Sequence, residues 1–221
     1  MAKILVGIPS VRDYPDFIAS MNVFLPAINK LHTIEVLEVK NKQIDQARNI
    51  IADYFLQRDY DYLLFLDDDH SGHTVEMLDT LLKMDSLVSA IQCYARFFPY
   101  LSNLMDYSGQ TDERMKYEVK YTEGINPCDL VGFGMTLIKK EVFRILPQPY
   151  FVGKDNQRED NYFCDNLVRM GVRPMGCFDY VLTHQGIDRA KGNELRELGM
   201  EEIKREVLKV HPDMNNVVLV V

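Results

Sequence analysis

Three consecutive aspartates end an apolar run in the first third of the chain. The run Tyr62–Leu66 is followed directly by Asp67, Asp68 and Asp69. Such a run predicts a buried strand, and in open α/β sheets ligands bind beyond the carboxyl ends of the strands. Three adjacent carboxylates repel one another unless a cation lies among them, and oxygen ligands favour hard ions such as Mg²⁺ or Mn²⁺. The segment therefore predicts a divalent-cation site, and a solvated acidic turn that caps the next helix is the alternative.

The spacing of the acidic segment tests two known classes of aspartate-rich loop. An EF-hand loop that begins at Asp67 requires a glutamate at its twelfth position, which Leu78 occupies, so this class is excluded. Haloacid-dehalogenase-type phosphatases also end a strand in Asp-x-Asp and use the first aspartate as nucleophile, but their motif continues with Gly-Thr or a similar pair. Here His70, Ser71 and Gly72 follow. The phosphatase is therefore the less favoured alternative.

A second acidic position begins the helix predicted over residues 160–170. Asp160 shares a helical face with Phe163, Cys164 and Leu167 by the i, i+3, i+4, i+7 spacing, so its carboxylate is expected to point inward. Such a carboxylate is either a structural cap worth about 1 kcal/mol or a general base whose partial burial raises its pKa toward the working range. The residues alone leave both roles open.

A histidine ends the strand predicted over residues 178–183. His184 is placed to lean into the same crevice as the aspartates and to supply a nitrogen ligand to a metal. His70 and His73 compete for this role because they lie nearer to the aspartates in the sequence.

Two glycines alternate inside the strand predicted over residues 130–138. Glycine weakens a strand, so Gly132 and Gly134 indicate either a bulge or a close approach of the backbone to a ligand. The chain carries neither GxGxxG nor GxxxxGK[ST], which excludes the dinucleotide fingerprint and ATPases or kinases with that phosphate loop.

Short apolar runs alternate with segments of helical period along the chain. This alternation is typical of an α/β architecture with a largely parallel sheet. Several runs are apolar on both faces, as strands buried between two layers of helices should be. The expected strands span residues 3–8, 33–39, 62–66, 87–93, 130–138 and 178–183, and the expected helices span 16–31, 44–57, 74–84, 160–170 and 194–210.

Two segments depart from this alternation. Residues 105–126 are polar, charged and rich in tyrosine, which predicts a surface excursion that forms a lid or an acceptor-binding wall. After Gly186, a helix and the apolar run Val217–Val221 are expected either to close back on the sheet or to pair with another subunit. The chain therefore divides into a main domain over residues 1–186 and an appended segment over 187–221, which offers a route to a homo-oligomer.

Composition narrows the function classes. The 221 residues carry 25 Lys and Arg against 33 Asp and Glu, a formal charge of −8, which argues against binding a DNA duplex or an anionic membrane through a broad basic face. With 47% hydrophobic residues the chain can bury a sizeable core. No apolar stretch approaches the roughly 18 residues of a membrane span. The four irregularly spaced cysteines predict reduced, buried thiols in a cytoplasmic protein.

Taken in order, six of these segments resemble the motifs of glycosyltransferases of the GT-A fold, particularly the family-two-like and phage-type members. The resemblance runs from residue 3 to about residue 186 and so covers most of the chain. The matching segments are Ile4–Ser10, Gln46–Asn49, the strand that leads into Asp67–Asp69, Val131–Ile138, Glu159–Cys164 and Thr183–Gly186.

The resemblance implies a single Rossmann-like α/β domain that moves a sugar, with inversion, from a UDP- or GDP-sugar to a hydroxyl of a glycan, protein or small molecule. It implies that Asp67, Asp69 and His184 hold Mn²⁺ or Mg²⁺ and that Asp160 deprotonates the acceptor. A bound cation suits this chemistry because the diphosphate leaving group gains negative charge. A non-catalytic nucleotide-sugar-binding module is the main alternative. The implied nucleotide-sugar contacts are Pro9, Ser10, Glu38, Arg48, Asp68, Gly132, Gly134 and Glu159.

Overall fold

The computed structural model describes residues 1–94, 102–110, 115–118, 121, 123–153 and 158–185. The helix expected over 194–210, the closing apolar run and the subunit contact that they were expected to provide lie outside the described residues. The appended segment over 187–221 therefore stays a prediction.

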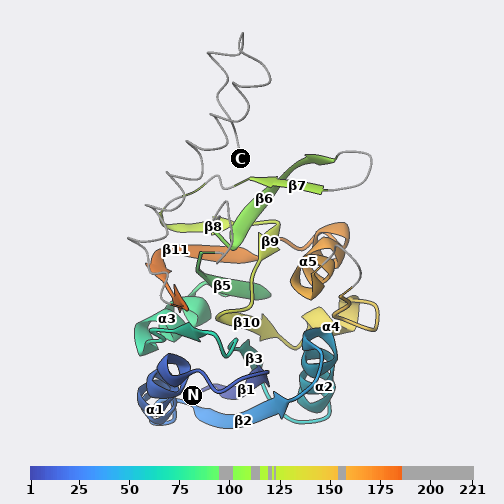
Figure 1. Cartoon of the computed structure of the whole chain (residues 1–221). Helices are drawn as coiled ribbons and strands as arrows, with labels where there is room; N and C mark the ends of the chain where they lie inside the picture. Colours follow the sequence, from blue (N-terminus) through green and yellow to red (C-terminus); the bar gives the residue numbers. More distant parts are fainter. Residues whose placement is uncertain (95–101, 111–114, 119–120, 122, 154–157, 186–221) are drawn as a thin grey trace.

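A seven-stranded sheet forms the centre of the fold (Figure 1). Five strands run in one direction, and β10 and β8 run against their neighbours. The sheet is thus mainly parallel, which confirms the expected architecture. The strands lie in the order β2 (Thr33–Lys40), β1 (Lys3–Ser10), β3 (Tyr62–Phe65), β10 (Thr136–Lys139), β5 (Val88–Gln92), β11 (Met175–Val181) and β8 (Ile125–Pro127).

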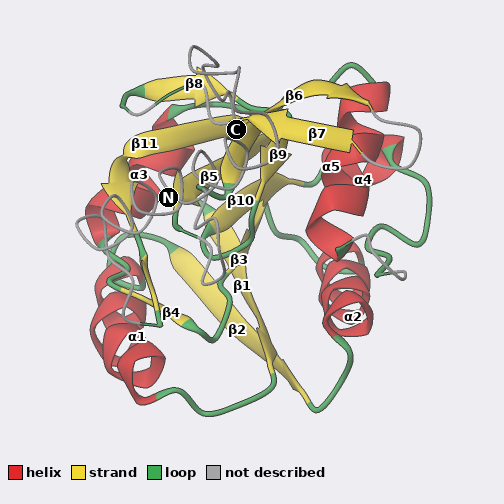
Figure 2. Cartoon of the chain, turned by 45° about the horizontal axis from the view of Figure 1, so that its top comes forward, coloured by secondary structure: helices red, strands yellow, loops and turns green. Residues whose placement is uncertain are grey.

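Helices cover both faces of this sheet. The helices α1 (Pro15–Ile28) and α3 (Val75–Lys83) lie on one side, and α2 (Ile44–Leu56), α4 (Val142–Ile145) and α5 (Glu159–Arg169) lie on the other (Figures 1 and 2). The side chains of β3 and of Leu66, which follows it, alternate between the two layers: Leu63 and Phe65 pack in one core cluster, and Leu64 and Leu66 pack in the other. A strand buried on both faces reads as a continuous apolar run, which is why β3 was recognisable in the sequence.

The prediction of a single strand over residues 130–138 is wrong. The chain forms two short strands there, β9 (Leu130–Val131) and β10, which belong to different sheets. The glycines lie in the connection and allow close packing, because a Cβ on Gly132 would lie 3.0 Å from the Asn103 side chain. The backbone thus turns from one sheet into the other at the point where the sequence was expected to continue straight.

The polar excursion over residues 105–126 contains regular structure. Strand β6 (Leu104–Gln110) pairs with β7 (Met115–Glu118) and, on its other side, with β9. In Figure 1, β6 and β7 of this three-stranded sheet stand above the central sheet. A smaller sheet pairs β4 (His70–Ser71) with β12 (Thr183–His184), and its register sets His184 opposite His70. None of the described helices is both long and apolar enough to cross a lipid bilayer.

Candidate active site

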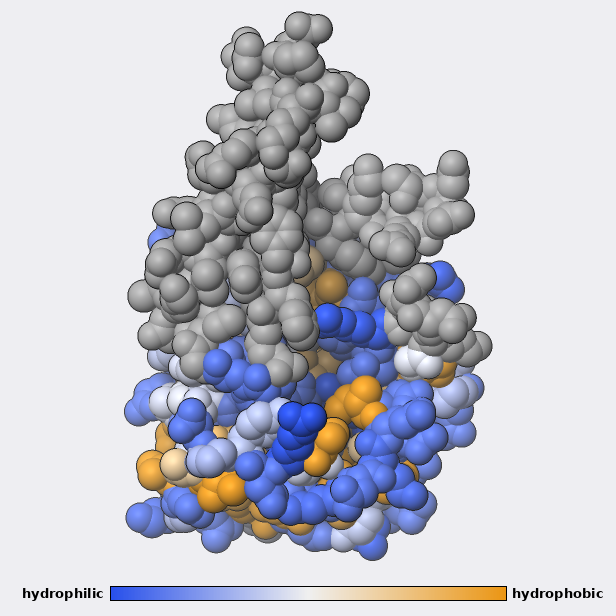
Figure 3. Space-filling view, in the orientation of Figure 1, coloured by the Kyte–Doolittle hydropathy of each residue, from blue (hydrophilic) through white to orange (hydrophobic). Residues whose placement is uncertain are grey.

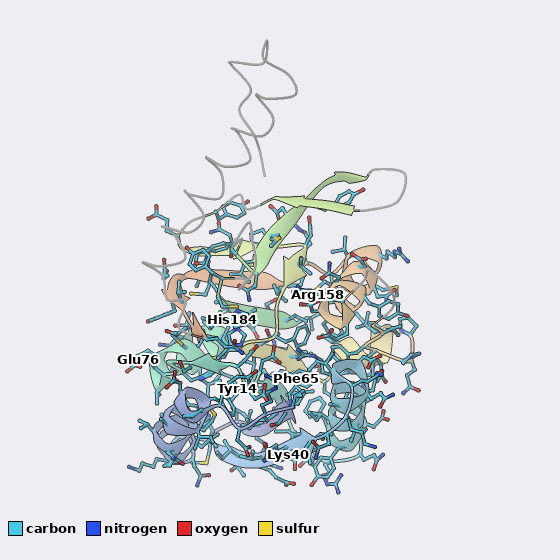
Figure 4. The ribbon with its side chains drawn as sticks, viewed as in Figure 1. Tyr14, Lys40, Phe65, Glu76, Arg158 and His184 are labelled. Carbon is cyan, nitrogen blue, oxygen red and sulfur yellow. The ribbon has the colours of Figure 1, made fainter. Side chains whose placement is uncertain are left out.

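A cavity of about 710 Å³ opens at the carboxyl edge of the central sheet. Its walls come from the ends of β1, β3 and β5, the connection between β9 and β10, the first turn of α5 and β12. In the space-filling view, hydrophilic and hydrophobic residues meet around the hollowed middle of this face (Figure 3). Figure 4 shows three of the lining residues on separate elements, namely Tyr14, Arg158 and His184.

Arg48 neutralises the first aspartate of the triplet. It lies on the buried face of α2, and its side chain is only 3% exposed. Its Nη2 donates to both oxygens of Asp67 at 2.9 and 3.2 Å, and its Nε donates to Glu159 Oε1 at 3.2 Å. The guanidinium carbon lies 4.4 Å from the centre of the Phe133 ring. Its Nη1 has no hydrogen-bond partner among the described residues. Arg48 thus spans two carboxylates at the cavity wall and keeps one donor free.

Asp68 holds the loop that follows β1. Its Oδ2 accepts hydrogen bonds from the backbone N–H groups of Val11 at 2.7 Å and Arg12 at 3.1 Å. Both of these residues line the cavity. The second aspartate therefore shapes the wall of the cavity through backbone contacts.

Asp69 faces two histidines. His184 Nδ1 lies 2.7 Å from the carbonyl oxygen of Tyr94, and since a carbonyl only accepts, Nδ1 carries the proton. The contact of 3.2 Å between His184 Nε2 and Asp69 Oδ2 is then a hydrogen bond from the imidazolium, which carries a proton on both nitrogens, whereas in neutral His184 it brings two acceptors together. Burial raises the pKa of Asp69, but the hydrogen bonds from His184 and His70 outweigh it and hold that pKa well below its usual range. In the neutral form, the Asp69 carboxylate and the Nε2 lone pair would suit a cation that takes the place of the proton.

The two competing histidines take different places. His70 stacks on His184 with ring centres 4.2 Å apart, and its Nδ1 lies 2.8 Å from Asp69 Oδ1. His73 instead lies 3.1 Å from Ser20 Oγ in the layer of α1, where burial lowers its pKa to about 3. Of the two, only His70 therefore belongs to the site.

Cys93 is a site residue that the sequence reasoning missed. Its Sγ lies 3.1 Å from His70 Nε2, and it lines the cavity just after the end of β5. Its place directly after a buried parallel strand was the available signal, because the carboxyl ends of such strands meet at one edge of the sheet.

Asp160 lines the cavity from the first turn of α5, next to Glu159. It is half-buried beside the cavity, whereas Glu159, Phe163 and Cys164 form the buried face of the helix. Burial raises the pKa of Asp160 to about 6, the neighbouring Glu159 adds to this rise and Arg48 opposes it. A carboxylate with such a pKa takes up and releases protons near neutral pH.

Three comparisons with known proteins bear on this geometry. No protein-family model matches the sequence, and no curated protein matches it. Among solved structures, A197 from STIV is 19% identical with a TM-score of 0.56, and the match covers 83% of this chain and 84% of that one. GalNAc-T7, solved with UDP, GalNAc and Mn²⁺, is 13% identical with a TM-score of 0.51 over 83% of this chain.

The chain has a GT-A fold. The match covers 43% of the GalNAc-T7 chain, so the present chain spans less than half of that protein. At these identities the likeness concerns the fold.

Within the GT-A fold, most of the sequence-predicted residues lie around the one cavity. Pro9 lines it, and Ser10 is buried behind it at the end of β1. Glu38 lies elsewhere, on the edge strand β2, where its carboxylate lies 3.3 Å from Lys40 Nζ on the exposed surface. The predicted residues among the described lining are Pro9, Arg48, Asp67, Asp68, Asp69, Gly132, Gly134, Glu159, Asp160 and His184.

Proposed function

We propose that the chain is a metal-dependent glycosyltransferase that moves a sugar, with inversion, from a nucleotide-sugar donor to a hydroxyl acceptor. UDP- and GDP-sugars are the first donors to test, and the acceptor is a glycan, a protein or a small molecule. One observation carries the proposal: Asp69 Oδ2 and His184 Nε2, which lie 3.2 Å apart, and the carboxylate of Asp160 line the same cavity.

The residues around Asp69 suit a divalent cation, Mn²⁺ or Mg²⁺. Asp69 Oδ2 and His184 Nε2 would hold it, and Asp67, whose oxygens Arg48 already engages, would add negative charge beside it. A cation bound there would stabilise the charge that grows on a diphosphate leaving group. Arg12 and Arg158 also line the cavity and offer positive charge to the same phosphates.

Asp160 is proposed as the base. Its carboxylate takes the proton of the acceptor hydroxyl, and the hydroxyl oxygen then displaces the diphosphate from the opposite face of the sugar, which inverts the anomeric centre. A pKa of about 6 suits this role because the group is mostly ionised at neutral pH and still accepts a proton readily.

The phosphatase alternative needs Asp67 as nucleophile. Both oxygens of Asp67 accept hydrogen bonds from Arg48 Nη2, which lowers their nucleophilicity and fixes their direction. This contact supports the glycosyltransferase over the phosphatase.

The test is a thermal-shift panel of UDP-, GDP-, CMP- and dTDP-sugars, each with Mn²⁺, with Mg²⁺ and with chelator. A donor that binds only the native state raises its stability by about 2.7 kcal/mol at a hundred times its Kd. We expect a cation-dependent shift with one nucleotide class, lost in Asp69→Asn and His184→Ala.

Release of nucleoside diphosphate from the bound donor separates a transferase from a non-catalytic binding module. Asp160→Asn should keep the donor-induced shift and lose about 10²–10⁴-fold in release rate. An Asp160→Asn variant with the full rate would rule out Asp160 as the base. Donor binding without release by the unaltered chain, with every acceptor class tried, would favour the binding module.

A further inference from the structure

Asn49 follows Arg48 on α2 and is not among the described residues that line the cavity. Its side-chain amide nevertheless makes four hydrogen bonds. Nδ2 donates to the carbonyl oxygens of Asp45 at 2.9 Å and Phe151 at 2.7 Å. Oδ1 accepts from the backbone N–H groups of Tyr150 at 3.0 Å and Phe151 at 3.2 Å. An asparagine amide offers two donors and two acceptor positions, so Asn49 uses its full hydrogen-bonding capacity.

The segment that Asn49 holds is tied to α2 at a second point. The backbone N–H of Gly153 donates to Asp45 Oδ2 at 3.2 Å. Asp45 and Asn49 are four residues apart and so lie on the same face of the helix. Because 102 residues separate Asn49 from Phe151, these contacts fix two remote parts of the chain against each other.

Phe151 carries this restraint to α5. Its ring is 1% exposed and stacks on the Phe163 ring, with ring centres 4.9 Å apart and 8° between the planes. The ring of Phe133, which lines the cavity, contacts both of these rings edge-on at 5.5 and 5.4 Å. Phe163 lies three residues after Asp160 on α5. Since protein interiors are close-packed, a shift of Phe151 would displace the first turn of this helix.

Arg48 reaches the same turn of α5 by a separate contact. Its Nε donates to Glu159 Oε1 at 3.2 Å, and both of these residues line the cavity. Asn49 and Phe151 are not among the lining residues that the structure describes. Loss of the Asn49 amide therefore leaves the groups that would face the donor in place.

We propose that Asn49 is a positioning residue for Asp160: it fixes Phe151, and the stack of Phe151 on Phe163 fixes the first turn of α5. The inference rests on the proposed glycosyltransferase function, and it names a residue that sets the transfer rate without setting the affinity for the donor. A displacement of about 1 Å, even when it originates far from the reacting atoms, lowers a rate by about a hundredfold.

The first test measures transfer and donor binding in Asn49→Ser. We expect kcat to fall by about ten- to a hundredfold, whereas the thermal shift that the donor adds in the presence of the cation stays unchanged. Asn126→Ser is the control, because the Asn126 amide donates to the Glu123 carbonyl outside the described cavity lining, and it should change neither quantity. Full kcat in Asn49→Ser, or an equal loss of donor binding, would overturn the inference.

The second test asks whether Asn49 acts through the stacked rings. Phe151→Leu keeps the backbone groups that Asn49 binds and removes the stack on Phe163. If the two residues act along one route, the double variant lowers kcat by less than the product of the two single reductions. A reduction equal to that product would show independent effects and overturn the inference.

Amide hydrogen exchange gives a readout that does not depend on activity. In Asn49→Ser the amides of Tyr150 and Phe151 lose their acceptor and should exchange about tenfold faster or more, relative to the amides of β1. The amides of Tyr162 and Phe163, near the start of α5, should also exchange faster. Asn49→Asp, which keeps the accepting oxygen and loses the two donated bonds, is the second variant if Asn49→Ser does not fold.

The exchange pattern separates this inference from the proposed function. Faster exchange confined to Tyr150 and Phe151 would overturn the inference and leave the glycosyltransferase proposal standing. Faster exchange that extends to α5, in a chain that transfers no sugar from any donor, would support the link from Asn49 to the first turn and count against the proposed function alone.

Discussion

Two side-chain clusters at the cavity contain neighbouring aspartates, but the aspartates have different partners. In the arginine cluster (Arg48, Asp67 and Glu159), one buried cation donates to both carboxylates. In the histidine cluster (Asp69, His70 and His184), the carboxylate meets imidazole nitrogens, one of which presents a lone pair when neutral. Asp67 and Asp69 are two residues apart, yet a guanidinium engages the first and two histidines contact the second.

The comparison shows that the role of each carboxylate in an acidic run is not determined by the run alone. The partners of each carboxylate define it, and two of them, Arg48 on α2 and His184 on β12, are distant from the run in the sequence. The arginine cluster should therefore contribute to the stability of the metal-free protein, and the histidine cluster to the stability that a cation adds. Substitutions in each cluster and at Asp160 test this division.

The largest expected effect is on the arginine cluster. Arg48→Met removes the cation and leaves two carboxylates at the cavity wall without their charged partner. Breaking a buried ion pair from one side costs about 3–5 kcal/mol. We expect a loss of this size in the free energy of unfolding, measured by urea denaturation in metal-free buffer.

A matched control is Arg58→Met, because Arg58 is exposed just beyond the same helix. This variant should lose less than about 1 kcal/mol, as surface charges usually do. If Arg48→Met lowered the free energy of unfolding as little as Arg58→Met, the arginine cluster would not stabilise the fold. The role given to Arg48 in the comparison would then be wrong.

The second largest effect is expected on the stability that a bound cation adds to the protein. At a hundred times the Kd of the cation, the unaltered chain should gain about 2.7 kcal/mol in stability. Asp69→Asn should lose most of this gain, since an amide is a poor ligand for a divalent ion. Asp67→Asn should keep the gain, because Arg48 already engages both oxygens of Asp67. The opposite pattern, with the gain lost in Asp67→Asn alone, would make Asp67 the ligand.

Much of the fold was predictable from local patterns. The run over residues 62–66 and the helical period over 44–57 each correspond to an observed element, because burial on one or both faces leaves a periodic signal. The strand expected over 130–138 failed because periodicity does not reveal that Leu130 and Thr136 pair in different sheets. Strand β11 begins at Met175, three residues before the start of the strand predicted over 178–183. Its first residues, which include Gly176, pair with β5.

The sequence predicted many of the residues that line the cavity, but not the contacts that they make with one another. Asp69, His184 and Asp160 lie at the cavity, as their positions at the ends of predicted elements indicated. The ion pair between Arg48 and Glu159 was not predictable, because 111 residues separate the two partners. Likewise, nothing local distinguishes His70 from His73. Their roles depend on the pairing of β4 with β12 and on the packing of α1.

A third effect concerns Asp160, in the first turn of α5. The pKa of Asp160 is raised to about 6, so the proposed base is lost as pH falls through that value. We expect kcat/KM for donor turnover to fall about tenfold per pH unit below pH 6. Donor binding at saturating metal, measured at each pH, serves as the control for protonation of the histidines. A flat profile with intact binding would contradict the assignment.

The raised pKa of Asp160 also affects the stability of the metal-free protein. Because the folded-state pKa of Asp160 lies above its ordinary value of 3.8, the ionised carboxylate costs stability above pH 6, and this cost disappears as pH falls toward 4. Asp160→Asn should therefore be more stable than the unaltered chain above pH 6, and the advantage should shrink on acidification. Urea denaturation of both proteins at matched pH values measures this difference.

The smallest effect is expected at Glu38, which the resemblance implied as a nucleotide contact. Its carboxylate pairs with Lys40 on the exposed edge strand, away from the described residues that line the cavity. An exposed ion pair contributes about 0.2–1 kcal/mol, so Glu38→Gln should change urea stability by no more than this and leave the donor-induced thermal shift unchanged. Lys40→Met should behave in the same way, because it breaks the same pair from the other side. Loss of donor binding in Glu38→Gln alone would extend the nucleotide site to β2, beyond the wall that the two clusters share.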